Sequence, residues 1–389
     1  MTEAYLTDAE PPKPVSPFEL FFDLVFVFSL TRVTSLVLGH PDVAGVGRGL
    51  LVLALLWWAW GAYAWLTNTV NIDTASSRAV ILGAMAAMLI VAVAVPQASG
   101  RNALAFALGY FVVRLLHLVL FAVAGGANRA AILRLAPGNL AASVLLIIGV
   151  FTPTTVQMGL WALAVMIDYG TPLITGVGGF TVHAGHFFER HTLFMIIALG
   201  ESVIAIGAGV LHTSGSITPI VACSIVLALA AISGLWWSYF DWEAGVTERV
   251  LSSSMGSRRA HLARDLFSYL HLPLVTGVVF AAVGVESVTS HPLDPLHGVH
   301  ALGLGGGVGI FLLGLSAVCG RRGHRPRVDH LIGGLLSLAT IPASTVLPGL
   351  LTLGILVVIL LFIAFVDRRA HSRSGVGERT DTVVVPVPR

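Results

Sequence analysis

The 389-residue sequence has little charge. Asp, Glu, Lys and Arg together make up 11% of it, against about 25% in an ordinary soluble domain. The hydrophobic fraction is 56% and the mean hydropathy is +0.88. So few charges cannot cover the surface of a soluble protein of this length. The composition argues against a cytosolic enzyme, a nucleic-acid-binding protein and a disordered scaffold, and it predicts an integral membrane protein.

Lysine and cysteine are also scarce. Lys13 is the sole lysine, so the pI near 8.7 comes from arginine and does not indicate a nucleic-acid-binding patch. The two cysteines, Cys223 and Cys319, lie in apolar runs, which does not suggest a disulfide framework. The first 17 residues carry acids and prolines in place of a basic start and an apolar core, so we predict no cleavable signal peptide.

Long apolar runs dominate the remainder. A membrane-spanning helix needs about 20 mostly apolar residues, and about twelve segments qualify. They are 18–38, 49–67, 79–95, 104–123, 137–151, 156–177, 191–211, 217–240, 266–288, 299–319, 330–346 and 349–366. The fifth segment is short and the sixth is interrupted by Gly170-Thr-Pro172. A fusion of these two, giving eleven spans, is therefore the alternative.

The arginines predict the orientation, because positive residues gather on the cytoplasmic side of membrane proteins. With twelve spans and a cytoplasmic N-terminus, 18 of the 22 basic residues fall on the cytoplasmic side. Arg48 and Arg101 fall outside, and Arg32 and Arg114 lie within spans. We therefore predict a multi-pass plasma-membrane protein with both termini in the cytoplasm.

Three landmarks recur along the chain and indicate an internal repeat. The pairs are Asp23 and Glu201 at an offset of 178, Trp57-Trp58 and Trp236-Trp237 at 179, and Ser77-Arg78 and Ser257-Arg258 at 180. This order and spacing predict two six-helix halves, 16–178 and 179–366, in the same orientation. A cytoplasmic tail, 1–15, precedes them, and a disordered cytoplasmic tail, 367–389, follows. Chance similarity between apolar segments is the alternative.

Several ionisable residues lie inside the predicted spans, where a charge costs from about 2.5 to more than 10 kcal/mol unless it has a partner or a wet cavity. Glu201 is near mid-membrane, and small residues surround it on its helix, so we expect it to point into the bundle. Asp23 either lines a cavity or forms a hydrogen bond to a neighbouring helix. Arg114, His117 and Asp168 lie at comparable depth. We predict that Arg114 balances Glu201 or Asp168, a fixed structural ion pair being the alternative to a functional one.

Two further patterns lie at span entries. Ser16-Pro-Phe-Glu19 predicts a capping box. His183, His186 and Glu189, which Arg190 follows, spread over about 120° of a helix and can hold a metal. Their spacing is not that of a zinc protease, so we favour a cluster that faces water or lipid headgroups. No metal or other cofactor is predicted.

Two long signatures carry a family resemblance. Phe18-Glu-Leu-Phe-Phe-Asp-Leu-Val-Phe-Val-Phe28 and Glu189-Arg-His-Thr-Leu-Phe-Met-Ile-Ile-Ala-Leu-Gly-Glu-Ser-Val-Ile204 resemble the bacterial low temperature requirement protein A (LtrA) family. The resemblance covers residues 16–366. It implies a multi-pass membrane protein linked to growth in the cold, of a family whose molecular activity is not established. The family motifs direct attention to Glu19, Asp23, Glu189, Arg190 and Glu201.

A shorter similarity concerns mechanism. Phe22-Asp-Leu-Val-Phe is similar to the Phe-Ser-Asp motif that opens the six-helix repeat of a lysosomal and bacterial potassium-channel family. Phe22 stands where that motif has Ser, and Gly200-Glu201 stands in place of Ser-Asp in the second half. These departures argue against carrying over potassium selectivity, and the similarity serves only to keep a channel among the hypotheses.

Transport is the leading hypothesis. We expect an ion, a proton or a small solute to move along a path lined by Asp23, Glu201, Arg114 and Asp168. The expected partners are the lipid bilayer and the transported species, with no nucleic acid, and the chain is compatible with a homo-oligomer. We do not expect an enzyme. The alternatives are a membrane enzyme that acts on lipid with a cytoplasmic His183–Glu189 site, and a membrane sensor or scaffold without flux.

Overall fold

The computed structural model describes residues 14–211, 217–323 and 326–373. Within these ranges the chain is almost entirely helical and has no β-strand. The main helices are α1 (Pro17–Gly39), α2 (Val43–Thr69), α3 (Ala75–Ala94), α4 (Ala103–Ala124), α5 (Arg129–Val150), α6 (Thr154–Ile174), α7 (Ala184–Leu211), α8 (Pro219–Ser238), α9 (Ala244–Ser252), α10 (Gly256–Ala263), α11 (His271–Ser290), α12 (Val299–Ala301), α13 (Gly307–Arg321), α14 (Val328–Ala343) and α15 (Gly349–Arg373).

Ten helical segments among the described residues are long and apolar enough to cross a membrane. They include α1 to α5, α7, α15 and three composite segments, 219–252, 256–290 and 299–321. Two of the predicted spans are not among the ten. One corresponds to α6 and the other to α14, a shorter apolar helix. The prediction of a helical multi-pass membrane protein is thus confirmed.

The fifth and sixth predicted spans are separate helices. α5 begins at Arg129, earlier than predicted, and contains Pro137, whereas α6 continues past Gly170 to its end at Ile174. Prolines are tolerated inside membrane helices where neighbouring helices stabilise the segment. Here Gly138 lies so close to Thr171 that a Cβ atom would come within 2.2 Å of the Thr171 hydroxyl oxygen. This close packing of α5 on α6 excludes the fused alternative.

Two composite segments extend beyond their predicted ends through π-helical turns. α8 continues through η3 (Tyr239–Glu243) into α9, and α10 continues through η4 (Arg264–Tyr269) into α11. Two indole N–H groups of α2 donate to Ser268 in η4. Trp57 donates to the Ser268 carbonyl at 2.8 Å, and Trp65 donates to the Ser268 hydroxyl at 3.0 Å. The wide π-helical turn therefore has partners on α2.

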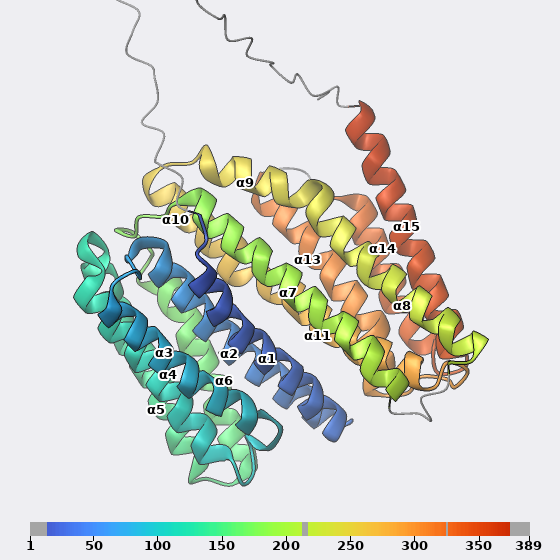
Figure 1. Ribbon diagram of the computed structural model, residues 1–389, viewed down its shortest axis with the longest axis horizontal. Coiled ribbons are helices and arrows are strands. Elements are labelled where there is room, and N and C mark those ends of the chain that lie inside the picture. The colour runs from blue at the N-terminus through green and yellow to red at the C-terminus, as the bar shows by residue number, and fades with distance from the viewer. Residues whose placement is uncertain (1–13, 212–216, 324–325, 374–389) are drawn as a thin grey trace, which may run out of the picture.

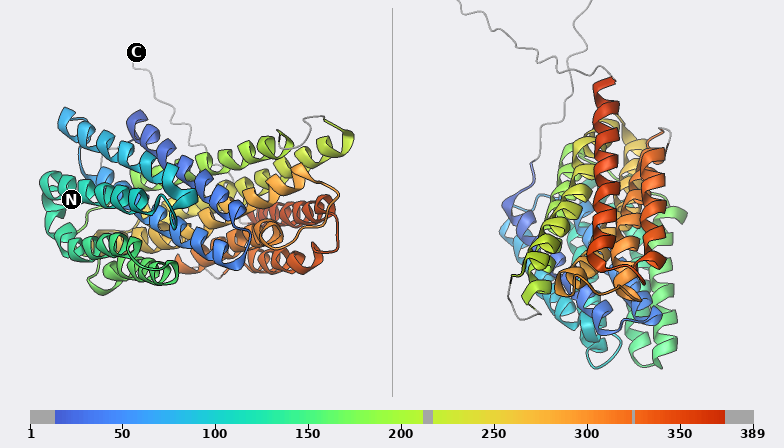
Figure 2. Two further views of the ribbon diagram at one scale, coloured as in Figure 1. Left: turned by 90° about the horizontal axis from the view of Figure 1, so that it is seen from below. Right: turned by 90° about the vertical axis from the view of Figure 1, so that its right-hand side faces the viewer.

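The helices form two sides that meet along a seam. α1 to α6 lie on one side and α7 to α15 on the other, with α1 and α7 adjacent at the seam (Figures 1 and 2). α1 also packs against α2, α3 and α11, while α2 packs against α4, α6 and α7. The start of α1 and the end of α15 lie at the same end of the bundle as α9 and α10 (Figure 1).

Glycine allows very close helix contacts on the second side. A Cβ atom on Gly284 would lie 2.3 Å from the backbone nitrogen of Leu304, which belongs to η5 (Leu302–Gly306). A Cβ atom on Gly307 would lie 2.3 Å from the backbone nitrogen of Ala281. The glycine-rich run 303–309 therefore brings the backbones of α11, η5 and α13 into contact, as small residues do in membrane helices.

The last helix runs into the segment predicted to be a disordered tail. α15 ends at Arg373, and the buried carboxylate of Asp367 accepts a hydrogen bond from Arg327. An ion pair at the end of the bundle therefore holds part of the segment 367–373, so the prediction of a tail from 367 is wrong there. Residues 374–389 and most of the predicted N-terminal tail lie outside the described residues.

Candidate functional site

The predicted capping box is present at the start of α1. The Ser16 hydroxyl oxygen accepts a hydrogen bond from the Glu19 backbone N–H at 3.3 Å, and the Glu19 carboxylate accepts one from the Ser16 N–H at 2.9 Å. Glu19 has a second role, because the same carboxylate also binds two side chains of α7. It is therefore both a helix cap and part of the contact between the two sides of the molecule.

Arg190 on α7 joins the two acids of α1. Its Nη1 donates to Glu19 Oε1 at 2.8 Å, and its Nη2 donates to Asp23 Oδ1 at 2.8 Å. The Trp60 indole N–H of α2 donates to the same Asp23 oxygen at 2.8 Å. Glu19, Asp23 and Arg190 are only 3%, 0% and 1% exposed. Asp23 thus forms hydrogen bonds to neighbouring helices, the second of the two settings predicted for it.

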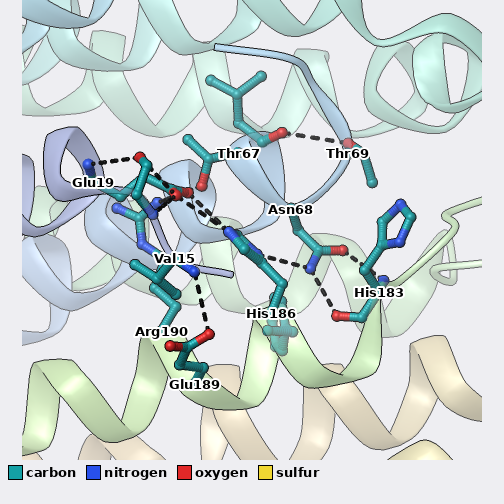
Figure 3. A network of polar contacts seen from close by, with 12 residues as sticks. Val15, Glu19, Thr67, Asn68, Thr69, His183, His186, Glu189 and Arg190 are labelled. Atoms are coloured by element: carbon teal, nitrogen blue, oxygen red, sulfur yellow. Dashed lines mark hydrogen bonds and ion pairs between the residues drawn. The ribbon is translucent and has the colours of Figure 1, made fainter. Parts of the chain in front are cut away.

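His186 extends this network toward the end of α2 (Figure 3). Its Nε2 lies 3.0 Å from Glu19 Oε1, and Asn68 Nδ2 lies 3.2 Å from its Nδ1. Because Asn68 donates to Nδ1, the proton of a neutral His186 ring is on Nε2 and points to Glu19. Two carboxylates and one guanidinium then leave one formal negative charge in the network. Asp23 Oδ2 is buried, and within the described chain it has no hydrogen-bond partner.

The His183–Glu189 cluster does not converge on one point. Asn68 forms 2.9 Å hydrogen bonds with the backbone N–H and carbonyl of His183, whereas Glu189 accepts from the Val15 backbone N–H at 3.1 Å (Figure 3). His186 is 2% exposed, so the prediction that it faces water or headgroups is wrong. Its ring points toward Glu19 because an acid on the adjacent helix provides a partner.

A different group among the described residues has metal-ligand spacing, namely Asp329, His330 and Asp367 at the start of α14 and in α15. The guanidinium of Arg327, however, donates to both Asp329 and Asp367. These carboxylates therefore already have a cationic partner, and the cluster is an ion-pair contact between α14 and α15.

Glu201 lies in a separate cavity, between α1, α7 and α11. The cavity has a volume of about 80 Å³. The Thr31 hydroxyl of α1 donates to Glu201 Oε2 at 2.6 Å. The other polar residues that line the cavity are Thr34, Ser202 and Glu286. Small residues of α7, such as Ala198, Ala205 and Ala208, also line it. Glu201 thus points between helices on the small-residue face, as predicted.

A stretch of mostly apolar buried side chains separates the Glu201 cavity from the network of Arg190, Glu19, Asp23 and His186. At ~1.5 Å per residue, Asp23 and Thr31 are about 12 Å apart along α1. Phe26, Val27 and Leu30 of α1 lie between them and are buried, as are Phe194 and Met195 of α7. The α1–α7 seam is therefore polar near the end that carries α9 and α10, apolar in the middle, and polar again at Glu201.

Arg114 binds Asp168, one of the two partners predicted for it. Its Nη2 lies 3.2 Å from Asp168 Oδ1 and also donates to the side-chain oxygen of Asn139 on α5. The Tyr110 hydroxyl donates to Asp168 Oδ2 at 3.3 Å. His117, one turn further along α4, packs its ring against Tyr63. This group lies inside the first side, and among the residues that the structure describes it shares no hydrogen-bond partner with Asp23 or Glu201. The expected path lined by all four residues is therefore not assembled.

Sequence reasoning missed several partners in these sites. Arg190 was identified through the family motif alone, and Thr31, Asn68 and Glu286 were not identified. One signal was available for Arg190. It lies about 9 Å from the start of α7, and Asp23 lies about 9 Å from the start of α1, at ~1.5 Å per residue. Because α1 and α7 begin at the same end of the bundle, the equal depths of Asp23 and Arg190 predict that these two side chains can pair.

Comparisons with known proteins bear on identity. An uncharacterized protein of Rhizobium meliloti (strain 1021), RA0937, is 29% identical over 313 residues, which cover 76% of this chain and 75% of that protein. No solved structure matches the chain significantly. Residues 14–365 match the sequence profile of the family described as bacterial low temperature requirement A protein. That match spans both signatures, α1 and α7 with their acids, and the first 17 of the 25 residues of α15. The chain belongs to the LtrA family.

Proposed function

We propose that this protein is a plasma-membrane transport protein that moves a small cation or a proton along the seam between α1, α7 and α11. The observation that carries the proposal is the Glu201 cavity, about 80 Å³ in volume, at a depth where a carboxylate is costly unless it has a task or a partner. Glu201 has one hydroxyl partner in Thr31 and no guanidinium partner within the described chain. A cation or a proton in the cavity would supply the missing positive charge.

The lining of the cavity matches this charge. Its polar groups are the carboxylates of Glu201 and Glu286 and the hydroxyls of Thr31, Thr34 and Ser202. The described lining residues include no basic side chain. Carboxylate and hydroxyl oxygens are the ligands that hard cations prefer. Ser202 Oγ is buried and has no hydrogen-bond partner in the described part of the structure, so one oxygen there is available to a bound ion.

The network of Arg190, Glu19, Asp23 and His186 forms the second polar site along the proposed path. It carries one formal negative charge when His186 is neutral, and Asp23 Oδ2 makes no hydrogen bond to the described residues. Between these two polar sites, the buried side chains of Phe26, Val27 and Phe194 fill the seam. On this proposal the described arrangement is a closed state, and transport requires α1 and α7 to move apart by enough to admit an ion.

The same proposal includes twelve spanning helices arranged as two six-helix repeats, 16–178 and 179–366. The helix contacts support it. α1 packs on α2 and α3, α4 packs on α3 and α5, and α6 packs on α5 and α2. On the second side, α7 packs on α8 and α11, α13 packs on α11 and α14, and α15 packs on α14 and α8. The aligned landmarks fall on corresponding helices, with Asp23 on α1 and Glu201 on α7. α6 and α14 are then the remaining two spans.

We further propose that the end of the bundle with α9 and α10 is cytoplasmic, and with it both termini. The arginines at the ends of the helices support this orientation, since positive residues gather in the cytoplasm. In the described residues, the opposite end carries Arg48 and Arg101, whereas the α9–α10 end carries Arg249, Arg258, Arg259, Arg321 and Arg322, among others. The proposal assigns a transport role and no enzymatic one, with the lipid bilayer and the transported cation as partners.

Flux through purified protein in liposomes tests the proposal. Proteoliposomes are loaded in turn with H⁺, Na⁺, K⁺ and Mg²⁺ gradients, and the flux of each is followed with an ion-specific dye. We expect Glu201→Gln to lower the flux at least tenfold, because the amide keeps the shape and removes the charge. Glu248→Gln is the matched control, since Glu248 is exposed on α9 and should leave the flux within twofold.

Two results would overturn the proposal. The first is the absence of flux for every ion in the wild-type protein, which would favour a sensor or scaffold. The second is equal flux in the wild type and Glu201→Gln, which would show that the cavity is a packing defect. Circular dichroism and the elution volume of each variant confirm that the comparison is made between folded proteins.

A further inference from the structure

A second cavity lies inside the first side of the molecule. α2, α4, α5 and α6 surround it, and η4 and the segment before α7 cover it. Its volume is about 70 Å³, and none of its described lining residues also lines the Glu201 cavity. Much of its wall is aromatic, formed by Trp57, Trp58, Trp65, Phe121 and Phe180. Ring walls of this kind favour a planar molecule, because aromatic faces stack on one another.

One polar region of this cavity lies next to the buried ion pair of Arg114 and Asp168. Asn139 and His117 contribute to the lining, and the Asn139 side-chain oxygen accepts a hydrogen bond from Arg114. Arg114 is 1% exposed, and its Nε and Nη1 have no hydrogen-bond partner among the residues the structure describes. His117 lies close to the Ala62 backbone, but neither ring nitrogen makes a hydrogen bond of normal geometry to the described chain. Unused polar groups therefore lie next to the aromatic wall.

The other polar region is at Arg264, whose side chain is 13% exposed. Its Nη1 donates to the Pro172 carbonyl at 3.0 Å, which holds the guanidinium at the edge of the cavity. Its Nε donates to Asp265 at 2.7 Å, but Asp265 also accepts two hydrogen bonds from Arg321, at 2.8 and 2.6 Å. Two guanidinium groups thus share one carboxylate. The edge of the cavity carries an excess positive charge, which favours an anion over a cation.

We infer that this cavity binds a small planar molecule with one negative charge, its ring between the Trp and Phe side chains and its anionic group at Arg264. The molecule enters from the end of the bundle that carries α9 and α10, because Arg264 lies at that end. A mostly apolar pocket with a few placed polar groups is the usual form of a small-molecule site. The inference is independent of cation transport at Glu201.

Binding of two planar carboxylates, benzoate and nicotinate, to the full-length protein in lipid nanodiscs tests the inference. Isothermal titration calorimetry measures each affinity, with the neutral benzamide and the cationic benzylamine as comparators. We expect saturable binding of at least one carboxylate, at least fivefold tighter than benzamide and tighter still than benzylamine. No saturable binding of either carboxylate would overturn the inference.

Two variants locate the site. A Cβ atom on Gly61, a lining residue, would meet nothing within 4 Å, so Gly61→Leu places its side chain in the cavity and should weaken binding at least tenfold. Gly159→Leu is the matched control, because Gly159 is an exposed residue of α6 that also has open space around it. Arg264→Gln should remove the preference for benzoate over benzamide. If Gly61→Leu binds as the wild type does, or if Arg264→Gln keeps that preference, the molecule is held elsewhere or in the lipid.

Discussion

The two sides of the molecule have similar helix contacts but different interiors. On the first side, aromatic side chains of α2 and α4 enclose a cavity of about 70 Å³ next to the Arg114–Asp168 pair. On the second side, α11 packs on η5 and α13 through glycines, and the cavity at Tyr239, Glu243 and His271 is only about 10 Å³. That volume is about the minimum for one water molecule. Similar helix contacts thus leave a cavity between aromatic side chains on the first side, whereas the backbones of α11, η5 and α13 touch on the second.

The positions of the buried charges follow the same difference. The first side places Arg114 and Asp168 well inside the bundle, where the ring-lined interior leaves room for side chains. The second side has its ion pairs near the end of the bundle, where Arg322 binds Glu243 and Arg327 binds Asp367. A backbone contact through glycine leaves no space for a guanidinium. These two ion pairs of the second side therefore lie where its helices end, whereas the carboxylate of Glu201 lies deeper, in the cavity between α1, α7 and α11.

The seam between the two sides is the place where the largest effect of a single substitution is expected. Arg190→Gln leaves Glu19 and Asp23 buried without their guanidinium partner. Loss of one partner of a buried ion pair costs roughly 3–5 kcal/mol. We expect Arg190→Gln to lower the thermal unfolding temperature of the detergent-purified protein markedly and to reduce the folded yield.

A matched control and a rescue make the Arg190 test specific. Arg78→Gln removes an arginine whose ion pair with Asp73 is exposed, and such pairs contribute about 0–1 kcal/mol. The triple variant Arg190→Gln with Glu19→Gln and Asp23→Asn removes the uncompensated charges and should recover part of the lost stability. Equal stability of Arg190→Gln and Arg78→Gln would show that the seam does not depend on this network.

Hydropathy predicted where the chain crosses the membrane, but it did not predict where the helices end. The eighth predicted span ended at residue 240, yet the helix continues through Asp241, Glu243 and Arg249 as far as Ser252. Glu243 can lie in a helix there because Arg322 from α13 neutralises it. Composition records the charge of a residue and not the partner that a distant segment supplies, so helix ends beyond the membrane were the least predictable part of the fold.

The candidate sites show the same limit. Depth along the helix correctly suggested Asp168 as a partner for Arg114, but it suggested Glu201 equally well. Which of the two acids pairs with Arg114 depends on which helices are neighbours, and α4 and α6 enclose the same interior whereas α7 lies across the seam. Arg190 was not predicted as the partner of Asp23 for the same reason, because the sequence does not show that α1 and α7 are neighbours. The buried acids could be identified from the sequence, but their partners could be identified only from the way the helices pack.

A second prediction sharpens the comparison of interiors. Gly284→Ala places a methyl group 2.3 Å from backbone atoms of η5, which cannot move as the end of a flexible side chain can. Overpacking of this kind typically costs 1–3 kcal/mol. We expect a moderate fall in the thermal unfolding temperature, smaller than that of Arg190→Gln. An unchanged unfolding temperature would mean that α11 and η5 are less tightly packed than their backbones indicate.

The smallest effect is expected for the same substitution on the first side. Gly61→Ala adds a methyl group that meets nothing within 4 Å, because Gly61 lines the aromatic cavity. Alanine favours the helix over glycine by roughly 0.5–1 kcal/mol, so the unfolding temperature should stay constant or rise slightly. Differential scanning fluorimetry of Gly61→Ala and Gly284→Ala in the same detergent measures the contrast directly. If both variants lose stability equally, the interior at Gly61 is as closed as the one at Gly284, and the difference between the two sides disappears.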